Sequence, residues 1–367
     1  MPISPASRST PGQLSDRTIT MSRGLATNAG GNMIDIDYLW VGEHEKTGDA
    51  IACQFTDPAS GANVVLVIDA GRRDDGTRVA DHIRKYYGVN RVDLAVCTHP
   101  DDDHIQGLFT LFESIPVSNL LIHRPEAYGY TSDDVKAGLV DELIAVATGA
   151  GTTVLHKFAG TTFFGGALLI AGPTEAYYRQ LLREQAVEVS LAASIAKALA
   201  RAATKVSNAI RSIGHDPGET LTSDNGGTTE RNNSSIILDL RVDGYRALFS
   251  GDAGVPALNA AADAIDALQP TKPVDFFHFP HHGSRHNLDP ATLDRLLGPI
   301  NSNYEIGSCF VSVGTEADDF PRPEVTNAIR RRGYPVRATR GQNIRWNKGG
   351  AERPDYSPIQ AIDWLAE

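Results

Sequence analysis

Several features are scarce in this 367-residue sequence, and each scarcity excludes a class of protein. Only three cysteines occur, Cys53, Cys97 and Cys309, each alone in an apolar run, which argues against a disulfide framework and predicts buried, reduced thiols. No run approaches the roughly 20 uncharged apolar residues that a membrane-spanning helix needs. The N-terminus lacks the apolar core of a secretory signal. Together these absences predict a cytoplasmic protein with no membrane contact.

A positive net charge is also missing. The chain has 34 Lys and Arg against 45 Asp and Glu, a formal net charge of −11. Bulk attraction to a phosphate backbone is therefore not expected, although a local basic groove is compatible with this balance. What the chain does have is the composition of an ordinary globular protein, with 41% hydrophobic residues and enough length for one large domain or two ordinary ones.

The pattern of apolar residues predicts one long domain between two tails. Residues 1–32 are rich in Ser, Thr, Gly and Pro, which is typical of a flexible tail. From 33 to 346 short apolar strands alternate with helical segments, whereas residues 347–367 are mostly polar. Strands, helices, further strands and further helices in this order favour an α+β fold of two packed sheets with helices outside over a single doubly wound sheet.

One stretch departs from this pattern. Residues 175–230 begin with an Ala-, Leu-, Glu- and Arg-rich segment that predicts one long helix or two shorter ones, and they end in a loop rich in turn residues. We interpret this stretch as a helical insertion. Three roles stay open for it: covering a sheet face, closing over a site as a lid, or pairing two copies of the chain as a homodimer.

The chemistry of the sequence concentrates in one segment that directly follows a buried strand. It runs HPDDDH over residues 99–104, so His99, Asp101, Asp103 and His104 share one tight loop. A solvated acidic turn with a helix cap is the alternative. Two histidines and three aspartates directly after an apolar strand favour metal binding instead, and imidazole with carboxylate suits Zn²⁺, Mn²⁺ or iron.

Two later strands end in residues of the same kinds. Asp252 follows one strand in the run FSGDA, and His281 and His282 follow another in the run PHHGS. Loops from different strands that meet at one edge of a sandwich commonly build a site, so we expect the three segments to converge. Ser284 is not interpreted as a nucleophile, because no Gly-x-Ser-x-Gly elbow surrounds it.

Together with Asp69, which ends an earlier apolar strand, this set resembles the metallo-β-lactamase superfamily. Asn232 and Asn233 before a strand, the turn over 41–50, and the FSGDA and PHHGS runs are most similar to the nuclease-like domain of the competence DNA-uptake protein ComEC. The resemblance implies a four-layer αβ/βα sandwich that holds two divalent metal ions, zinc or manganese.

The resemblance also implies roles for individual residues. The implied metal ligands are His99, Asp101, Asp103, His104, Asp252 and His282. His99 and Asp101 would bind one ion, Asp103 and His104 the other, and Asp252 both. Asp103 and His281 would take part in catalysis, with His281 closer to the substrate. Asp69 would orient ligand imidazoles from behind.

Two departures from the family pattern affect the first metal. Most of the superfamily has histidine where Asp101 stands, and a further histidine ligand before Asp252 has no equivalent here. His123, His156 and His215 are isolated in the sequence and are interpreted as core or loop histidines. The sequence therefore predicts a first metal that is weakly bound, or bound only together with a substrate phosphate.

The charges of the predicted site favour an anionic substrate. Three aspartates offset three of the four positive charges of two divalent ions, which fits a phosphodiester better than a lactam or a thioester. Arg322 is a candidate phosphate-binding residue, with a solvated surface arginine as the alternative. Asn233 and Ser284 are further candidates for substrate contact, and capping of the next strand is the alternative for Asn233.

The sequence as a whole predicts a metal-dependent phosphodiesterase or nuclease that uses a metal-bound hydroxide on nucleic acid or a small nucleotide. Two other functions stay open. One is a thioester or lactam hydrolase of the same fold. The other is a catalytically degenerate domain that binds nucleotide or nucleic acid through its metals.

Overall fold

The computed structural model describes residues 18–19, 32–132, 135–187, 211–223, 227–268, 272–301 and 305–367. The predicted N-terminal tail lies outside these residues, except for Thr18–Ile19 and residue 32. Residues 188–210 and 224–226 of the predicted insertion lie outside them as well. No helix in the described ranges is long and apolar enough to cross a membrane.

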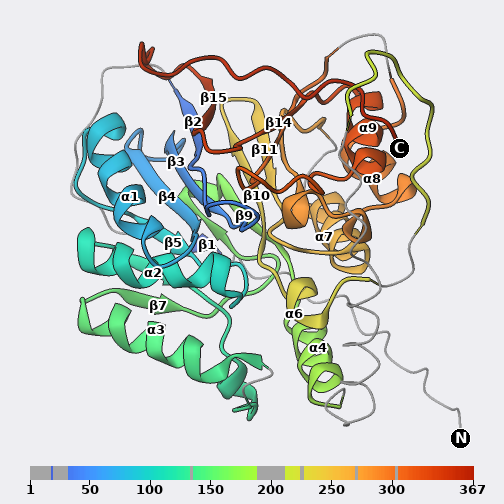
Figure 1. Ribbon diagram of the computed structural model, residues 1–367. Helices are drawn as coiled ribbons and strands as arrows, with labels where there is room; N and C mark the ends of the chain where they lie inside the picture. The colour runs from blue at the N-terminus through green and yellow to red at the C-terminus, as the bar shows by residue number, and fades with distance from the viewer. Residues whose placement is uncertain are drawn as a thin grey trace, which may run out of the picture.

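Two sheets pack face to face between two layers of helices (Figure 1). The seven-stranded sheet contains, in spatial order, β15 (Ile344–Lys348), β2 (Ile34–Tyr38), β3 (Ala50–Thr56), β4 (Asn63–Ala70), β5 (Leu94–Val96), β6 (Asn119–Leu121) and β7 (Thr153–Leu155). The eight-stranded sheet contains β1 (Thr18–Ile19), β8 (Thr162–Phe163), β9 (Leu168–Gly172), β10 (Ile237–Val242), β11 (Tyr245–Phe249), β12 (Phe276–His278), β13 (Ser308–Val311) and β14 (Val336–Ala338). The predicted αβ/βα sandwich is confirmed.

The helices lie outside the two sheets. Those against the first sheet are α1 (Asp75–His82), α2 (Asp102–Ser114) and α3 (Ala137–Gly149), and those against the second are α7 (Val255–Leu268), α8 (Pro290–Leu297) and α9 (Pro323–Arg331). From the predicted insertion and the residues after it, the structure describes α4 (Glu175–Val187) and α6 (Glu230–Asn233), which lie against each other at one end of the sandwich (Figure 1).

Alternation along the strands builds three apolar layers. In β4, Val64, Leu66 and Ile68 face the other sheet, whereas Val65 and Val67 face the helices. A strand covered on both faces is apolar at every position, which is why its sequence shows no alternation.

Parallel pairing brings the ends of several strands to one edge. Strands β4, β5 and β6 run parallel in the first sheet, and β11, β12, β13 and β14 run parallel in the second. The segments that follow β5, β11 and β12 are those predicted to carry metal ligands. The fold therefore places all three at the carboxyl ends of parallel strands.

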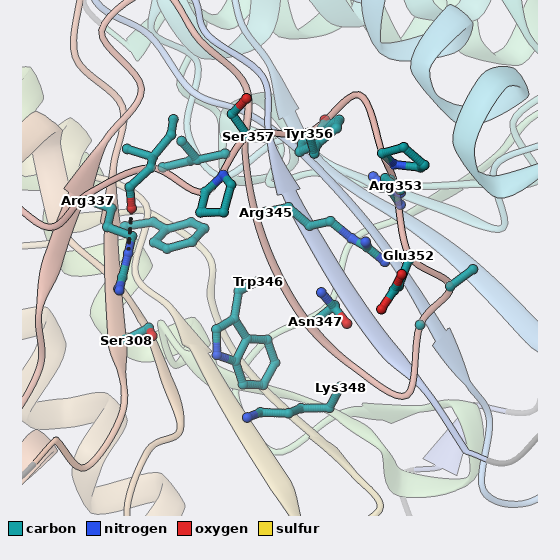
Figure 2. A pocket seen from close by; sticks show the side chains of 17 residues that line it. Ser308, Arg337, Arg345, Trp346, Asn347, Lys348, Glu352, Arg353, Tyr356 and Ser357 are labelled. Atoms are coloured by element: carbon teal, nitrogen blue, oxygen red, sulfur yellow. Dashed lines mark hydrogen bonds between the residues drawn. The ribbon is translucent and has the colours of Figure 1, made fainter.

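The segment predicted as a C-terminal tail packs against the sandwich. Strand β15 extends to Lys348 and pairs with β2, and Arg353 then forms ion pairs with Asp35 and Asp37. A cavity of about 680 Å³ lies between this segment and the edges of β14 and β15, with Trp346 among its walls (Figure 2). No residue of the predicted site lines this cavity.

Candidate metal centre

The loop between β5 and α2 carries four of the predicted metal ligands to the sheet edge. His99 and Asp101 precede α2, whereas Asp103 and His104 lie in its first turn. The backbone amide of His104 donates to the carbonyl oxygen of Asp101 at 2.9 Å, which closes the loop into the helix. Carboxylates in the first turn are stabilised by the unpaired N–H groups of the helix N-terminus.

A second loop supports this helix start through one glycine. A Cβ on Gly48 would lie 2.6 Å from the carbonyl oxygen of Asp103, so only glycine permits this approach. The backbone amide of Asp49 donates to the same oxygen at 3.1 Å. The close contact fixes the position of Asp103 relative to the first sheet.

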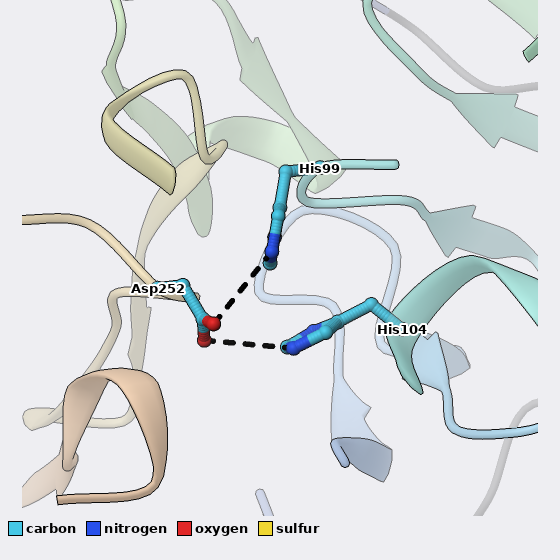
Figure 3. Close-up of side chains that lie close together, drawn as sticks. All are labelled: His99, His104 and Asp252. Carbon is cyan, nitrogen blue, oxygen red and sulfur yellow. Dashed lines mark ion pairs between the residues drawn. The ribbon is translucent and has the colours of Figure 1, made fainter. Parts of the chain in front are cut away.

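Two imidazoles face one carboxylate at the centre of the site (Figure 3). His99 Nε2 lies 3.6 Å from Asp252 Oδ2, and His104 Nε2 lies 3.5 Å from Asp252 Oδ1. All three side chains are buried. One carboxylate thus presents a different oxygen to each histidine, as a bridging ligand would.

A second group of donors shares His104. His282 Nε2 lies 3.5 Å from Asp103 Oδ2, and these two residues with His104 form a cluster whose donor atoms lie within 4.8 Å of one another. The cluster is built from the first turn of α2 and the turn after β12. It brings together the predicted ligands of the second metal.

Two further side chains lie on the side of Asp252 Oδ2. Asp101 Oδ2 is 3.6 Å from His99 Nε2, and His281 Nε2 is 3.7 Å from Asp252 Oδ2. The donors therefore form two sets that meet where Asp252 faces His104. The first is the cluster of His99, His104 and Asp252 with Asp101 and His281 beside it, and the second is the cluster of Asp103, His104 and His282.

Asp69, at the end of β4, fixes the orientation of two of these imidazoles. Its Oδ1 accepts a hydrogen bond from Thr98 N at 2.8 Å, and its Oδ2 accepts from Thr98 Oγ1 at 2.6 Å and from His104 Nδ1 at 2.8 Å. Because the Thr98 hydroxyl gives its only proton to Asp69, it accepts from His99 Nδ1 at 3.0 Å. Both imidazoles thus hold an Nδ1 proton in a hydrogen bond and direct Nε2 toward Asp252.

The two histidines of the PHHGS run are oriented in the same way. His282 Nδ1 donates to the carbonyl oxygen of Ser312 at 3.1 Å. The Asn287 amide nitrogen donates to the carbonyl oxygen of Asp252 at 2.8 Å, so its Oδ1 is free to accept from His281 Nδ1 at 3.1 Å. All four imidazoles therefore direct Nε2 toward the centre.

The inward atoms fit metal ions. His99 Nε2, His104 Nε2, His282 Nε2 and Asp252 Oδ1 are buried and have no hydrogen-bond partner within the described residues. Buried polar atoms without partners are costly, and a cation would satisfy all of them at once. Ligand histidines whose other ring nitrogen is held by a carboxylate or carbonyl are the usual arrangement around bound metal.

The electrostatics of the site favour positive charge at its centre. Burial disfavours ionisation of Asp252, but the surrounding imidazoles, that of His104 first, hold the pKa of its carboxyl well below the usual range. Burial likewise opposes protonation of His282, yet Asp103 and other carboxylates raise its pKa to about 9. In the metal-free protein, protons on the inward imidazole nitrogens would occupy the positions that divalent ions take when they bind.

One side of the centre opens to solvent. The side chain of Asp252 is 4% exposed, whereas those of Asp101, Asp103 and His281 are 23%, 24% and 37% exposed. The centre is therefore accessible to solvent where these three side chains lie.

The predicted substrate-binding residues make local contacts. Asn233 Oδ1 accepts from Gly254 N at 3.1 Å, and Ser284 Oγ accepts from His286 N at 3.3 Å. Arg322 donates its backbone N–H to the carbonyl oxygen of Gly283 at 2.9 Å. This bond places Arg322 beside the PHHGS turn, with its guanidinium 3.9 Å from Asp319. Their contact with substrate stays a prediction.

The isolated histidines are not part of the centre. His123 stacks on Phe158 and contacts His156 and Tyr178. Its Nε2 donates to a backbone carbonyl, and burial lowers its pKa to about 3. His215 is exposed. Within the described ranges, none of the three belongs to a cluster of metal-ligating side chains.

Sequence reasoning missed several residues next to the donors. Arg231 Nε donates to Asp101 Oδ1, although the sequence predicts only a loop there and α6 begins at Glu230. Asp49 and His278 form a buried ion pair of 3.1 Å close to His282. A histidine inside an otherwise apolar strand was the available signal for His278, whereas no local pattern marks Arg231.

The fold and the donor sets define the class of protein. Residues 60–297 match the model of the metallo-β-lactamase superfamily, and the chain belongs to this superfamily. No curated protein matches it. Among solved structures, it is similar to a new diphosphatase from the PhnP family, with 10% identity and a TM-score of 0.40, covering 86% of this chain and 98% of that chain. It is also similar to the metallo-β-lactamase SMB-1 bound to 2-mercaptoethanesulfonate, with 11% identity and a TM-score of 0.33, covering 71% of this chain and 81% of that chain.

Proposed function

We propose that this metal-dependent hydrolase cleaves phosphodiesters, in nucleic acid or in a small nucleotide. The observation that supports the proposal is the meeting of two donor sets at Asp252. Two divalent ions would bring four positive charges, and Asp101, Asp103 and Asp252 would offset three of them. The remaining positive charge favours an anionic substrate over a neutral thioester.

The residues at the centre suit zinc or manganese, because both accept imidazole and carboxylate ligands. His99, Asp101, Asp103, His104, Asp252 and His282 would hold two ions. When bound, the ions supply an activated water at neutral pH and neutralise charge on the phosphoryl oxygens. The FSGDA and PHHGS runs are also the basis for proposing a relation to the ComEC-like nuclease subgroup.

Residues around the ions would position the reacting groups. Asp69 would keep Nε2 of His99 and His104 directed inward, because it holds their Nδ1 protons directly or through Thr98. Asp103 and His281 lie on the open side, where a bound phosphodiester would meet them. Arg322, on the loop beside the PHHGS turn, is the candidate for holding a non-bridging phosphate oxygen.

The experiment compares three substrate classes on the zinc- or manganese-loaded protein. Initial rates would be measured with bis(p-nitrophenyl) phosphate, nitrocefin and a glutathione thioester. We expect turnover of the diester, retained by the exposed-surface control His215→Ala and lost in Asp252→Asn. A preference for nitrocefin or the thioester would overturn the proposal in favour of the other hydrolases. Metal and nucleotide binding without any turnover would favour a degenerate binding domain.

A further inference from the structure

The first donor set is unusual because two of its members replace expected histidines. Asp101 stands where an imidazole is the family pattern, and no described histidine between this motif and Asp252 reaches the centre. A carboxylate on a short side chain can rotate and can bind through one oxygen or two. A site built on it needs a group that fixes which oxygen faces the metal.

Arg231 performs this fixing in the structure. Its Nε donates to Asp101 Oδ1, and this leaves Oδ2 facing His99 Nε2 at 3.6 Å. The arginine is held in turn by α6. Thr229 Oγ1 accepts from the amide of Asn232, and the Ser234 hydroxyl donates to the carbonyl oxygen of Arg231 at 2.6 Å.

His281 supplies the second replacement. Its Nε2 faces Asp252 Oδ2, the same oxygen that His99 Nε2 faces. Its Nδ1 donates to Asn287 Oδ1, so this imidazole is oriented by a hydrogen bond at Nδ1, as the other three are. His281 and His282 have φ of 49° and 55°, in the left-handed region that non-glycine residues rarely occupy. Two such residues in succession turn one imidazole toward each donor set. Backbone strain of this kind persists where surrounding contacts require it.

We propose that His281 joins His99 and Asp101 at the first metal site, with Asn287 positioning His281 and Arg231 positioning Asp101. The proposal rests on the proposed function only in taking the centre to bind two ions. It makes the first site depend on α6, and α6 packs against α4 of the insertion (Figure 1). Helix α6, supported by α4, therefore helps to set the affinity of the first ion.

The test measures metal binding, with activity as a separate readout. Protein stripped of metal is equilibrated with Mn²⁺ or Zn²⁺ by dialysis, and bound ions are counted by mass spectrometry. We expect two ions in the wild type and in His215→Ala, and one tight ion in His281→Ala and in Asp101→Ala. His281→Gln serves as a second variant of similar size if His281→Ala unfolds.

Arg231 is tested by coupling to Asp101. Arg231→Met should weaken the first ion by about 10- to 100-fold and leave the second unchanged, and Arg231→Lys should restore part of the loss. In an Asp101→Asn background, Arg231→Met should have no further effect, because Arg231 acts through that carboxylate.

Three results decide between the proposals. A wild type that binds no ions would overturn the proposed function itself. A wild type that binds two ions, with His281→Ala binding both at unchanged affinity, would overturn only this inference. An equal effect of Arg231→Met in both backgrounds would show that Arg231 does not position Asp101.

Discussion

Replacing Asp69 by asparagine changes one atom in the network that orients the metal-facing imidazoles. The wild-type carboxylate accepts three hydrogen bonds, two from Thr98 and one from His104 Nδ1. An asparagine amide offers one accepting oxygen and one donating nitrogen. If its oxygen accepts from the Thr98 amide, its NH₂ group faces the Nδ1 proton of His104. If it is flipped, the NH₂ group faces the Thr98 amide instead.

The size of the effect follows from these contacts. One buried donor is left without an acceptor in either orientation, at a cost of about 1–3 kcal/mol, and a charge-assisted bond to a carboxylate of comparable value is lost. We therefore expect the metal-free Asp69→Asn protein to lose about 2–4 kcal/mol of unfolding free energy. His104 can relieve the clash by giving up its Nδ1 proton and keeping the proton on Nε2, which blocks the inward lone pair that a metal needs. Metal affinity should consequently fall by about 10- to 100-fold.

The assay combines urea denaturation of the metal-free protein with a competitive chelator titration. Asp37→Asn is the matched control, because Asp37 is also a buried carboxylate of the first sheet but contacts Tyr87 and His82 instead of the centre. The control should lose stability and keep its metal affinity. Unchanged metal affinity in Asp69→Asn would refute the argument that Asp69 holds the imidazoles in position.

Two further predictions concern regions away from the centre. Arg353→Met should lower the free energy of unfolding, measured by urea denaturation, by about 3 kcal/mol, because it leaves the buried Asp35 and Asp37 without this partner. Metal affinity should not change. A loss of unfolding free energy below about 0.5 kcal/mol would contradict the ion pairing. Burial, with the nearby His156, lowers the pKa of His123 to about 3 in the folded protein. As pH drops from about 6.5 toward 3, His123 is therefore protonated in the unfolded chain but not in the folded one, and the free energy of unfolding falls. His123→Gln should flatten this part of the stability–pH curve, and an unchanged slope would show that His123 does not contribute.

Local patterns were sufficient to predict much of the fold. The apolar run 64–68 and the helix starts at Pro290 and Pro323 carry their signals within a few residues, and the strand and both helices form there. The HPDDDH segment could be predicted as a metal site for the same reason. Its four donors are close in sequence and follow a buried strand.

The partners of these donors could not be predicted, because they are distant in sequence and chemically ordinary. Arg231 is 130 residues from Asp101, and Asn287 is 35 residues from the Asp252 carbonyl that it binds. The C-terminal segment shows the same limit. Its polar residues indicate a tail, yet Arg353 reaches Asp35 across 318 residues and fastens the segment to the sandwich. Such contacts depend on the assembled topology.

The central claim is that Asp252 joins two metal sites, and counting ions bound to Asp252→Ala tests it most directly. Wild-type protein and the variant would be loaded with Zn²⁺ or Mn²⁺, dialysed together, and analysed for metal per chain, with circular dichroism as the check on folding. We predict that the folded variant loses at least one ion and nearly all phosphodiesterase activity, because its carboxylate serves both donor sets. A folded Asp252→Ala protein that keeps both ions would contradict the account.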